Sequence, residues 1–296
     1  MKILLAGASG FIGGALVPAL RAEGHEIRRL VRRSPSGPDE IAWHPGEGRL
    51  DPAALEGIDA VVNLAGENVG AGRWTVKRRE AILRSRTDST RTLVTTLAKL
   101  KRKPAVLLSA SACGFYGERG DEVLTEASAI GHGFLPEVCL AWETHAEGAA
   151  RSGVRTVLLR FGVVLAPDGG ALAKMLPLFR RGLGGRLGRG AQWMSWIGID
   201  DAVDAIRHAL REPRLTGPVN IVAPAPVRNV EFTATLLRVL RRPALLPVPA
   251  TVLKWVFGQM AEETLLASTR TVPQRLQDTG FVFRHPTLEE ALRATV

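Results

Sequence analysis

The stretch from Ile3 to Gly24 predicts a buried strand, a glycine-rich turn and a helix, in that order. The apolar run Ile3-Leu4-Leu5-Ala6 precedes the segment Gly7-Ala8-Ser9-Gly10-Phe11-Ile12-Gly13, and apolar residues then recur at helical spacing. Such a unit points backbone N–H groups at the positive end of a helix toward a diphosphate. The sequence therefore predicts an α/β chain organised around a nucleotide site.

Each glycine of this segment has an expected role. Gly7 allows the tight turn, Gly10 lets the backbone approach the phosphates, and Gly13 lets the helix pack closely on the strand. The spacing is GxxGxxG, and an ordinary glycine turn is the alternative that the pattern leaves open. We expect Pro18 to kink the helix that follows.

The next predicted strand, from His25 to Val31, ends in Arg32 and Arg33. At this point of dinucleotide-binding folds, an acidic residue holds the ribose 2′-hydroxyl, whereas arginines suit a 2′-phosphate. The segment has two arginines and no acid, which favours NADP(H) over NAD(H). A basic strand end without this role is the alternative, because the chain has 39 basic residues.

Composition narrows the class of protein. The 296 residues are 46% hydrophobic and 23% charged, typical of a globular chain, and no apolar run reaches the ~18 residues of a membrane span. The start of the chain lacks the secretory pattern, so we expect a cytoplasmic location. Cys113 and Cys139 provide neither a disulfide framework nor zinc-ligand spacing, so we expect no metal site and a packed thiol at Cys113.

The net charge of +10 raises the question of nucleic-acid binding. The basic residues are scattered, apart from the cluster between Lys99 and Lys103, and aromatic residues make up only 5% of the chain. Stacking platforms for bases are therefore not evident. We expect a solvated basic surface and no nucleic-acid partner.

Two further predicted strands bring candidate site residues to the same edge of the sheet. The first ends in Leu64, Ala65 and Gly66, and the second is followed by Ser109 to Gly117. Ligands of doubly wound sheets lie outside the carboxyl ends of the strands, so small residues there permit close approach of a cofactor. A hydroxyl such as that of Ser111 can polarise a carbonyl, although a serine at a strand end is more often a cap.

Past Ala166 the composition shifts toward glycine-rich loops. Trp193 and Trp196 fit either a substrate wall or plugs of the core, and the pair Asp200-Asp201 favours small-molecule binding. We expect residues 1–165, joined by 197–222, to form the nucleotide-binding domain. Residues 166–196 and 223–296 then form a smaller lobe.

Taken together, these stretches resemble the extended short-chain dehydrogenase/reductases, and more closely their atypical NAD(P)-dependent epimerase branch with a C-terminal domain of unknown function. The resemblance implies a Rossmann-type doubly wound parallel sheet, bound NADP(H) and a smaller C-terminal substrate lobe. The matching segments are Gly7 to Gly13, Asn63 to Asn68, Arg73-Trp74, Ser85-Arg86, Tyr116-Gly117, Arg160 to Leu165, Trp196-Ile197, Asp200-Asp201, Asn220, Ala223-Pro224 and Arg242 to Phe281.

The resemblance also implies roles for individual residues. Ser9 to Ile12 would cover the diphosphate, and Arg32 and Arg33 the 2′-phosphate. Ser111 matches the catalytic serine or threonine of the superfamily, and Arg73 matches a position near the cofactor. The full set of implied cofactor-binding residues is Gly7, Ser9, Gly10, Phe11, Ile12, Gly13, Arg32, Arg33, Leu64, Ala65, Gly66, Arg86 and Val163.

One departure from the family pattern bears on chemistry. Catalytic members use a tyrosine as acid or base and a lysine four residues later that lowers the tyrosine pKa. Alignment on Glu143 places Leu135 and Cys139 at those positions, and the one tyrosine of the chain is Tyr116. Substrate-assisted proton transfer, Tyr116 and Glu67 are the replacements that the sequence leaves open.

Two functions follow. The first is an NADP(H)-binding epimerase or oxidoreductase that acts on an unknown small molecule through Ser111 and an unidentified group. The second is a non-catalytic NADP(H)-binding sensor or interaction protein, favoured by the missing tyrosine and lysine. For either function we expect a monomer or homodimer.

Overall fold

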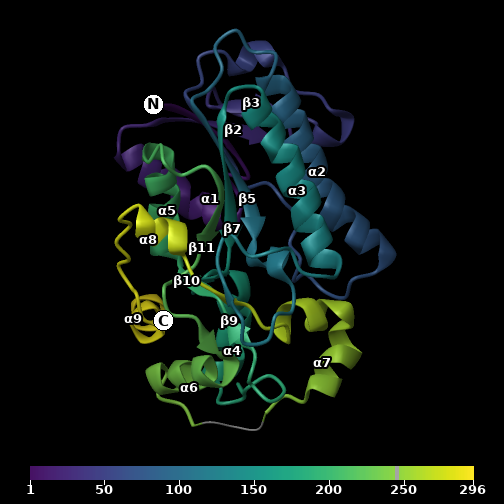
Figure 1. Ribbon diagram of the computed structural model, residues 1–296, viewed down its shortest axis with the longest axis vertical. Coiled ribbons are helices and arrows are strands. Elements are labelled where there is room, and N and C mark those ends of the chain that lie inside the picture. The colour runs from purple at the N-terminus through teal and green to yellow at the C-terminus, as the bar shows by residue number, and fades with distance from the viewer. Residues whose placement is uncertain (244–246) are drawn as a thin grey trace.

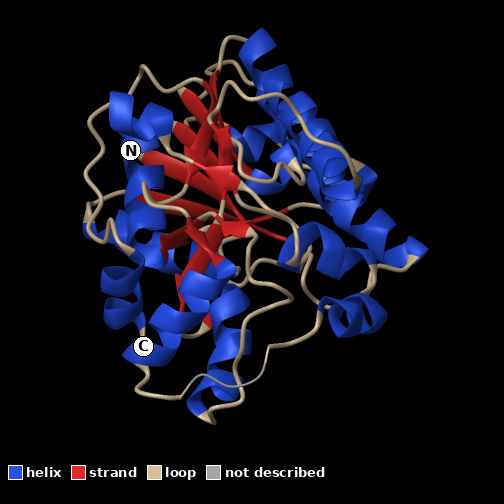
Figure 2. Ribbon diagram, turned by 60° about the horizontal axis from the view of Figure 1, so that its bottom comes forward, coloured by secondary structure: helices blue, strands red, loops and turns tan. Residues whose placement is uncertain are grey.

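The computed structural model describes residues 1–243 and 247–296. Within them a seven-stranded parallel sheet forms the centre of the molecule, with helices on both sides (Figures 1 and 2). Residues 244–246, which fall in the predicted C-terminal lobe, lie outside the described residues. In spatial order the strands are β11 (Gly217–Ile221), β7 (Arg155–Phe161), β5 (Val106–Ala112), β4 (Ala60–Asn63), β1 (Lys2–Ala6), β2 (Glu26–Val31) and β3 (Glu40–Ala42).

The chain reverses its direction of travel across the sheet between β1 and β4. From β1 it runs outward through β2 to β3, then returns to β4 on the other side of β1 and continues through β5, β7 and β11. This is the order of a doubly wound dinucleotide-binding sheet, in which the ligand crevice opens at the reversal. The predicted fold class is therefore confirmed, and the loops after β1 and β4 are neighbours at this reversal.

Alternating residues of the buried strands serve two cores. Ile3 and Leu5 of β1 pack with Leu16 and Leu20, whereas their neighbour Leu4 packs with Leu93. A parallel sheet covered on both faces requires this continuous apolar character. One face carries α1 (Phe11–Ala22) and α5 (Ile199–Arg211), and the other carries α2 (Val76–Leu97) and α3 (Phe134–Arg151) (Figure 1).

Helix α1 runs from Phe11 to Ala22 through the exposed Pro18, so this proline does not end the helix. Short 3-10 helices at Pro45–Glu47, Pro52–Leu55 and Cys113–Tyr116 occur in the loops.

A smaller third core lies below the sheet in Figure 1. It joins α4 (Gly170–Arg180), α6 (Asn229–Val239) and α9 (Leu288–Thr295) to the parallel pair β8 (Val163–Ala166) and β10 (Trp196–Gly198). Trp196 is fully buried in this core, so of the two readings left open for it the core plug is correct. The remaining short elements of the C-terminal part are β6 (Val123–Leu124), β9 (Trp193–Met194), β12 (Val227–Arg228), α7 (Ala250–Phe257), a π-helical turn (Ala261–Leu265) and β13 (Arg270–Thr271). Helix α8 (Gln274–Asp278) lies beside α5 instead, and its Leu276 packs in the core that contains α1 (Figure 1).

Helix α4 lies in the segment after Ala166 whose sequence indicates glycine-rich loops, so the helix was not predicted. This helix contains Pro177 and begins at Gly170, yet it buries Leu172, Leu176 and Phe179 in the third core. Tertiary burial therefore outweighs the weak local helix preference. None of the described helices is long and apolar enough to cross a membrane.

Candidate nucleotide-binding and active site

The glycine turn after β1 is closed by two contacts that no larger residue could make. Gly7 has a φ of +82°, and a Cβ placed on it would lie 2.8 Å from the carbonyl carbon of Leu64. A Cβ on Gly13 would lie 2.2 Å from the carbonyl oxygen of Gly7. The glycines therefore let α1, β1 and the end of β4 meet at backbone distance, as expected of a close helix–strand junction.

The first turn of α1 is open toward solvent. Gly10 is the N-cap and offers no side-chain acceptor to the helix N–H groups, and the first turn contains no acidic residue. Ser9 and Gly10 are exposed, while Phe11 and Ile12 are half-buried. An uncapped N-terminus of this kind is suited to an anion because its N–H groups and the helix dipole both favour negative charge.

The end of β4 lies directly beside the glycine turn. The Leu64 amide donates to Ala6 at 2.9 Å, and Asn63 Oδ1 accepts from the Ala65 amide at 3.3 Å. Gly66 lies against the Arg86 guanidinium, whose carbon would be 3.3 Å from a Cβ on this glycine. The turn after β1 and the small residues after β4 are thus side by side.

Arg86 brings a cation to the end of β4 without a carboxylate partner among the described residues. Its Nη1 donates to the Ile82 carbonyl at 3.0 Å, and its guanidinium lies 4.9 Å from the centre of the Trp142 ring. Burial lowers the pKa of Arg86 from its ordinary value, because the charged form loses solvation. An anion at this position would restore that lost solvation.

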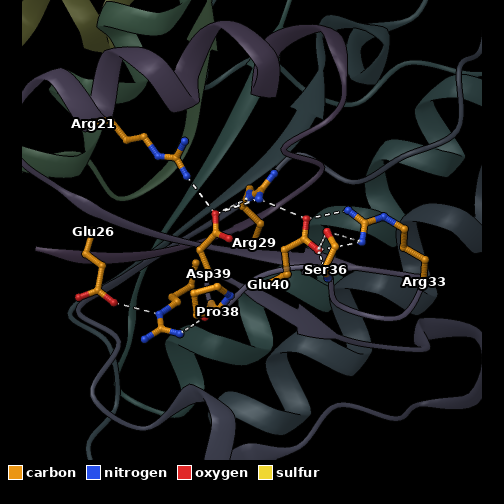
Figure 3. A network of polar contacts seen from close by, with 9 residues as sticks. Arg21, Glu26, Arg29, Arg33, Ser36, Pro38, Asp39 and Glu40 are labelled. Carbon is orange, nitrogen blue, oxygen red and sulfur yellow. Dashed lines mark hydrogen bonds and ion pairs between the residues drawn. The ribbon is translucent and has the colours of Figure 1, made fainter.

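The two arginines at the end of β2 have different surroundings. Arg33 forms a two-point ion pair with Glu40 on the neighbouring strand β3, with N–O distances of 2.7 and 2.8 Å (Figure 3). Arg32 is exposed, and its side chain forms no hydrogen bond or ion pair within the described part of the chain. Sequence reasoning missed Glu40, because the acid reaches Arg33 from β3 through strand pairing.

Glu40 is held by several donors. Besides Arg33 it accepts from the Ser36 amide at 2.8 Å and the Ser36 hydroxyl at 3.0 Å, and Arg29 lies 3.2 Å away. Its side chain is only 1% exposed. The hydrogen bond from Arg33, supported by the Ser36 amide, lowers the pKa of Glu40 to about 2.

Ser111, the candidate catalytic hydroxyl, is part of a buried polar network. Its Oγ donates to Glu143 Oε1 at 2.6 Å, and Glu143 forms a two-point ion pair with Arg160 at 2.8 Å for both contacts. All three residues are at most 5% exposed. The hydroxyl proton of Ser111 is therefore committed to Glu143.

Tyr116 lies in the same network. Arg160 Nη1 donates to the Tyr116 hydroxyl at 3.0 Å, and that hydroxyl donates to Asn220 Oδ1 at 2.7 Å. Burial raises the pKa of Tyr116 above its ordinary value. The tyrosine is fully buried, and its hydroxyl links Arg160 on β7 to Asn220 on β11. These contacts give Tyr116 a structural role.

The start of α3 carries the positions of the usual tyrosine and lysine. Leu135 packs on Gly114, where a Cβ would lie 3.3 Å from the Leu135 Cβ. Cys139 is buried, and burial raises the pKa of its thiol to about 12. Neither side chain supplies an acid, a base or a cation at neutral pH.

A pocket of about 330 Å³ opens beside Leu135. The start of α3 and the turn after β5 form one side, and the C-terminal segment from Lys254 to Ala267 forms the other. Its lining residues are Gly114, Gly117, Glu118, His132, Leu135, Pro136, Lys254, Glu262, Glu263, Leu266 and Ala267.

Glu263, from the π-helical turn, caps α3 across this pocket. Its carboxylate accepts from the amides of Phe134 at 3.1 Å and Leu135 at 2.8 Å, and from Gln259 Nε2 at 2.7 Å. The C-terminal segment thus supplies the capping group that Gly133 lacks. No local sequence signal reveals this pairing, since the partners are 128 residues apart.

Several other predicted residues have defined places. Glu67 pairs with Arg78 at 2.9 Å, and Arg73 donates to the Trp255 carbonyl at 3.4 Å. Val163 is half-buried at the start of β8. The carboxylate of the buried Asp201 accepts from the amides of Arg284 at 2.6 Å and His285 at 3.1 Å, so this aspartate fastens the C-terminal segment.

Two protein-family models match the chain. Residues 3–222 match the NAD dependent epimerase/dehydratase family, and residues 248–295 match a domain of unknown function, DUF1731. The chain belongs to the NAD dependent epimerase/dehydratase family. The predicted resemblance is thereby confirmed, including the C-terminal domain of unknown function.

Individual relatives cover nearly the whole chain. An epimerase family protein of Mycobacterium bovis is 45% identical over 290 residues, which are 98% of this chain and 96% of that protein. The crystal structure of human epimerase family protein SDR39U1 (isoform 2) with NADPH has a TM-score of 0.92 and 34% identity, and the match covers 99% of this chain and 98% of that one. A nucleoside-diphosphate sugar epimerase from Corynebacterium glutamicum has a TM-score of 0.81 and 36% identity, covering 99% of this chain and 57% of that one.

Proposed function

We propose that this family member binds NADP(H) in the crevice between β1 and β4. The carrying observation is the junction of Gly7 and Gly13, which places an uncapped helix N-terminus directly beside Leu64 at the reversal of the sheet. The family match and the NADPH held by the human relative support the same cofactor.

In this proposal each group of residues contacts a different part of NADP(H). Ser9 to Ile12 cover the diphosphate, Arg32 and Arg33 the 2′-phosphate, and Leu64 and Ala65 lie along the ribose and adenine side. Arg86 and Val163 border the same crevice. When bound, NADP(H) supplies or accepts a hydride.

The proposed activity is that of an oxidoreductase or epimerase on a small molecule. Ser111 remains the candidate catalytic group, and its contact with Glu143 means that it would act on a substrate as a hydrogen-bond acceptor. The pocket beside Leu135 is the proposed substrate site. Accordingly, residues 1–165 with 197–222 form the nucleotide domain, and residues 166–196 and 223–296 form the substrate lobe.

A non-catalytic sensor or interaction protein is the second candidate. It is favoured by the apolar Leu135 and the protonated Cys139 at the positions of the usual tyrosine and lysine. Both candidates share the cofactor, and they differ in turnover. Transfer of deuterium from labelled NADPH to any of a panel of carbonyl compounds and sugar nucleotides would support the enzyme.

The first experiment is a titration of the purified chain with NADPH and, separately, NADH, followed by nicotinamide fluorescence. We expect micromolar binding of NADPH, on the order of −8 kcal/mol, and weaker binding of NADH. Arg32→Ala should weaken NADPH selectively, whereas Arg293→Ala, an exposed arginine on α9 that pairs with Glu289, should not. Absence of binding by either cofactor at millimolar concentration would reject the proposal.

The proposal also covers the location of the protein and its oligomeric state. We expect a cytoplasmic monomer or homodimer that binds no nucleic acid. Sedimentation of the purified chain tests the assembly, and a salt-dependent shift of labelled DNA or RNA would contradict the last expectation.

A further inference from the structure

The carboxylate of Glu40 occupies one end of the Arg33 guanidinium. Nη1 and Nη2 of Arg33 each donate to a different oxygen of Glu40, and Nη1 also contacts the Ser34 carbonyl and the Ser36 hydroxyl. Within the described residues, Nε–H of Arg33 has no acceptor. A guanidinium can bind two planar anions at once, because its Nη1–Nη2 edge and its Nε–Nη2 edge each form a two-point contact.

Arg33 lies on the exposed side of the pair. The Arg33 side chain is 57% exposed, whereas the Glu40 side chain is 1% exposed. The buried carboxylate of Glu40 therefore holds the exposed Arg33 side chain through two hydrogen bonds and limits its rotation. An arginine without such a partner would lose this freedom only when the ligand binds, which weakens binding.

The charge of Glu40 is itself offset. Arg29 lies 3.2 Å from the same oxygen that Arg33 Nη2 contacts, and the Ser36 amide and hydroxyl bind the other oxygen (Figure 3). Two arginines thus surround one carboxylate, and Arg32 adds a third cation at the end of β2. The field at the exposed side stays suited to an anion.

We propose that Glu40 is a positioning residue for NADP(H) selectivity: it holds Arg33 so that the open Nε edge faces the 2′-phosphate. This inference rests on the proposed function, since it concerns the same cofactor. Glu40 itself touches no cofactor atom in this arrangement. It differs from the acid of NAD-binding folds, because its oxygens are occupied by Arg33, Arg29 and Ser36.

The test compares dissociation constants of NADPH and NADH for the full chain carrying Glu40→Gln. We expect the NADPH constant to rise by about three- to tenfold while the NADH constant changes by less than about twofold. Asp39→Asn is the matched control, because Asp39 pairs with Arg21 and Arg29 and not with Arg33. This control should leave the ratio of the two constants unchanged.

Other outcomes overturn the inference. An unchanged ratio in Glu40→Gln means that Arg33 needs no positioning, and tighter NADPH binding means that the acid opposes the phosphate. If Glu40→Gln does not fold, Arg33→Lys decides, because it keeps the exposed charge and loses the two-edged fork. If Arg33→Lys binds NADPH with the same dissociation constant as the unmodified chain, the inference is rejected. A rise of about three- to tenfold in that constant supports it. Failure of the unmodified chain to bind NADPH rejects the proposed function instead.

Discussion

Arg160 and Glu143 form a two-point ion pair beneath the carboxyl ends of β5 and β7, with both N–O distances at 2.8 Å. The pair is buried, and the Arg160 guanidinium also lies 3.5 Å from the centre of the Phe115 ring. It connects Ser111 on one side to Tyr116 on the other. The candidate catalytic Ser111 is therefore held in place by the carboxylate that also pairs with Arg160 of β7.

Removal of one partner from this pair should destabilise the protein strongly. Glu143→Ala leaves the Arg160 charge buried without its partner, and such a loss costs about 3–5 kcal/mol. Urea unfolding followed by circular dichroism measures the change in the free energy of unfolding. Glu147→Ala on the exposed side of the same helix is the control and should cost less than about 0.5 kcal/mol. Equal effects of the two variants would contradict a structural role for the pair.

The two adjacent glycines of α1 should respond in opposite ways to alanine. Gly13→Ala places a Cβ 2.2 Å from the Gly7 oxygen, so we expect lower stability and loss of NADPH binding. Gly14→Ala meets no atom within 4 Å and is exposed on the helix, so we expect a gain of about 0.5–1 kcal/mol. Thermal unfolding and the fluorescence titration measure both effects. Normal NADPH binding by Gly13→Ala would show that the glycine turn is not the cofactor site.

Both thiols should be inert in the folded protein. Burial raises the pKa of Cys113 and of Cys139 to about 12, so both stay protonated and shielded at pH 8. A thiol-reactive chromogen should label neither until denaturant is added, and then both. Rapid labelling of the native chain would mean that the α3 region opens readily.

The cap on α3 should depend on the C-terminal segment. Glu263→Ala removes the acceptor for the Phe134 and Leu135 amides, with an expected cost of about 1 kcal/mol. Hydrogen exchange should accelerate at those two amides. Glu262→Ala is the control, because within residues 1–243 and 247–296 this exposed side chain pairs with Lys254 alone, at 3.0 Å. If exchange at α3 is the same in both variants, the cap does not hold the helix start.

Acid should remove the contribution of Glu40 over a defined range. The pKa of Glu40 falls from an ordinary 4.5 to about 2 in the folded chain, so the unfolded state takes up the proton first as the pH drops. The stabilisation is complete above pH 4.5 and is lost as the pH falls toward 2. The stability difference between the unmodified chain and Glu40→Gln, measured by urea unfolding, should shrink over that range and stay constant above it.

Local sequence patterns predicted the central sheet well because its strands are buried on both faces. Continuous apolar runs such as Ile3 to Ala6 and Val106 to Leu108 have little alternative to a covered parallel strand. The positions of Gly7 and Gly13 were equally legible, since only glycine allows the contacts that they make. Helix α4 was missed, because Gly170 and Pro177 interrupt its local pattern, and its stability comes from burial of its apolar face in the third core.

What the sequence determined by itself is the doubly wound parallel sheet, the strand, glycine turn and helix at its start, and the absence of the usual tyrosine and lysine, because these follow from residues close together in the chain. Only the tertiary structure decided which charges are free. Glu40 reaches Arg33 from the next strand, Glu143 holds Ser111 and Arg160, and Glu263 crosses from the C-terminal segment to α3. A charged side chain takes the partner that folding brings within about 3 Å, and sequence spacing does not reveal that distance.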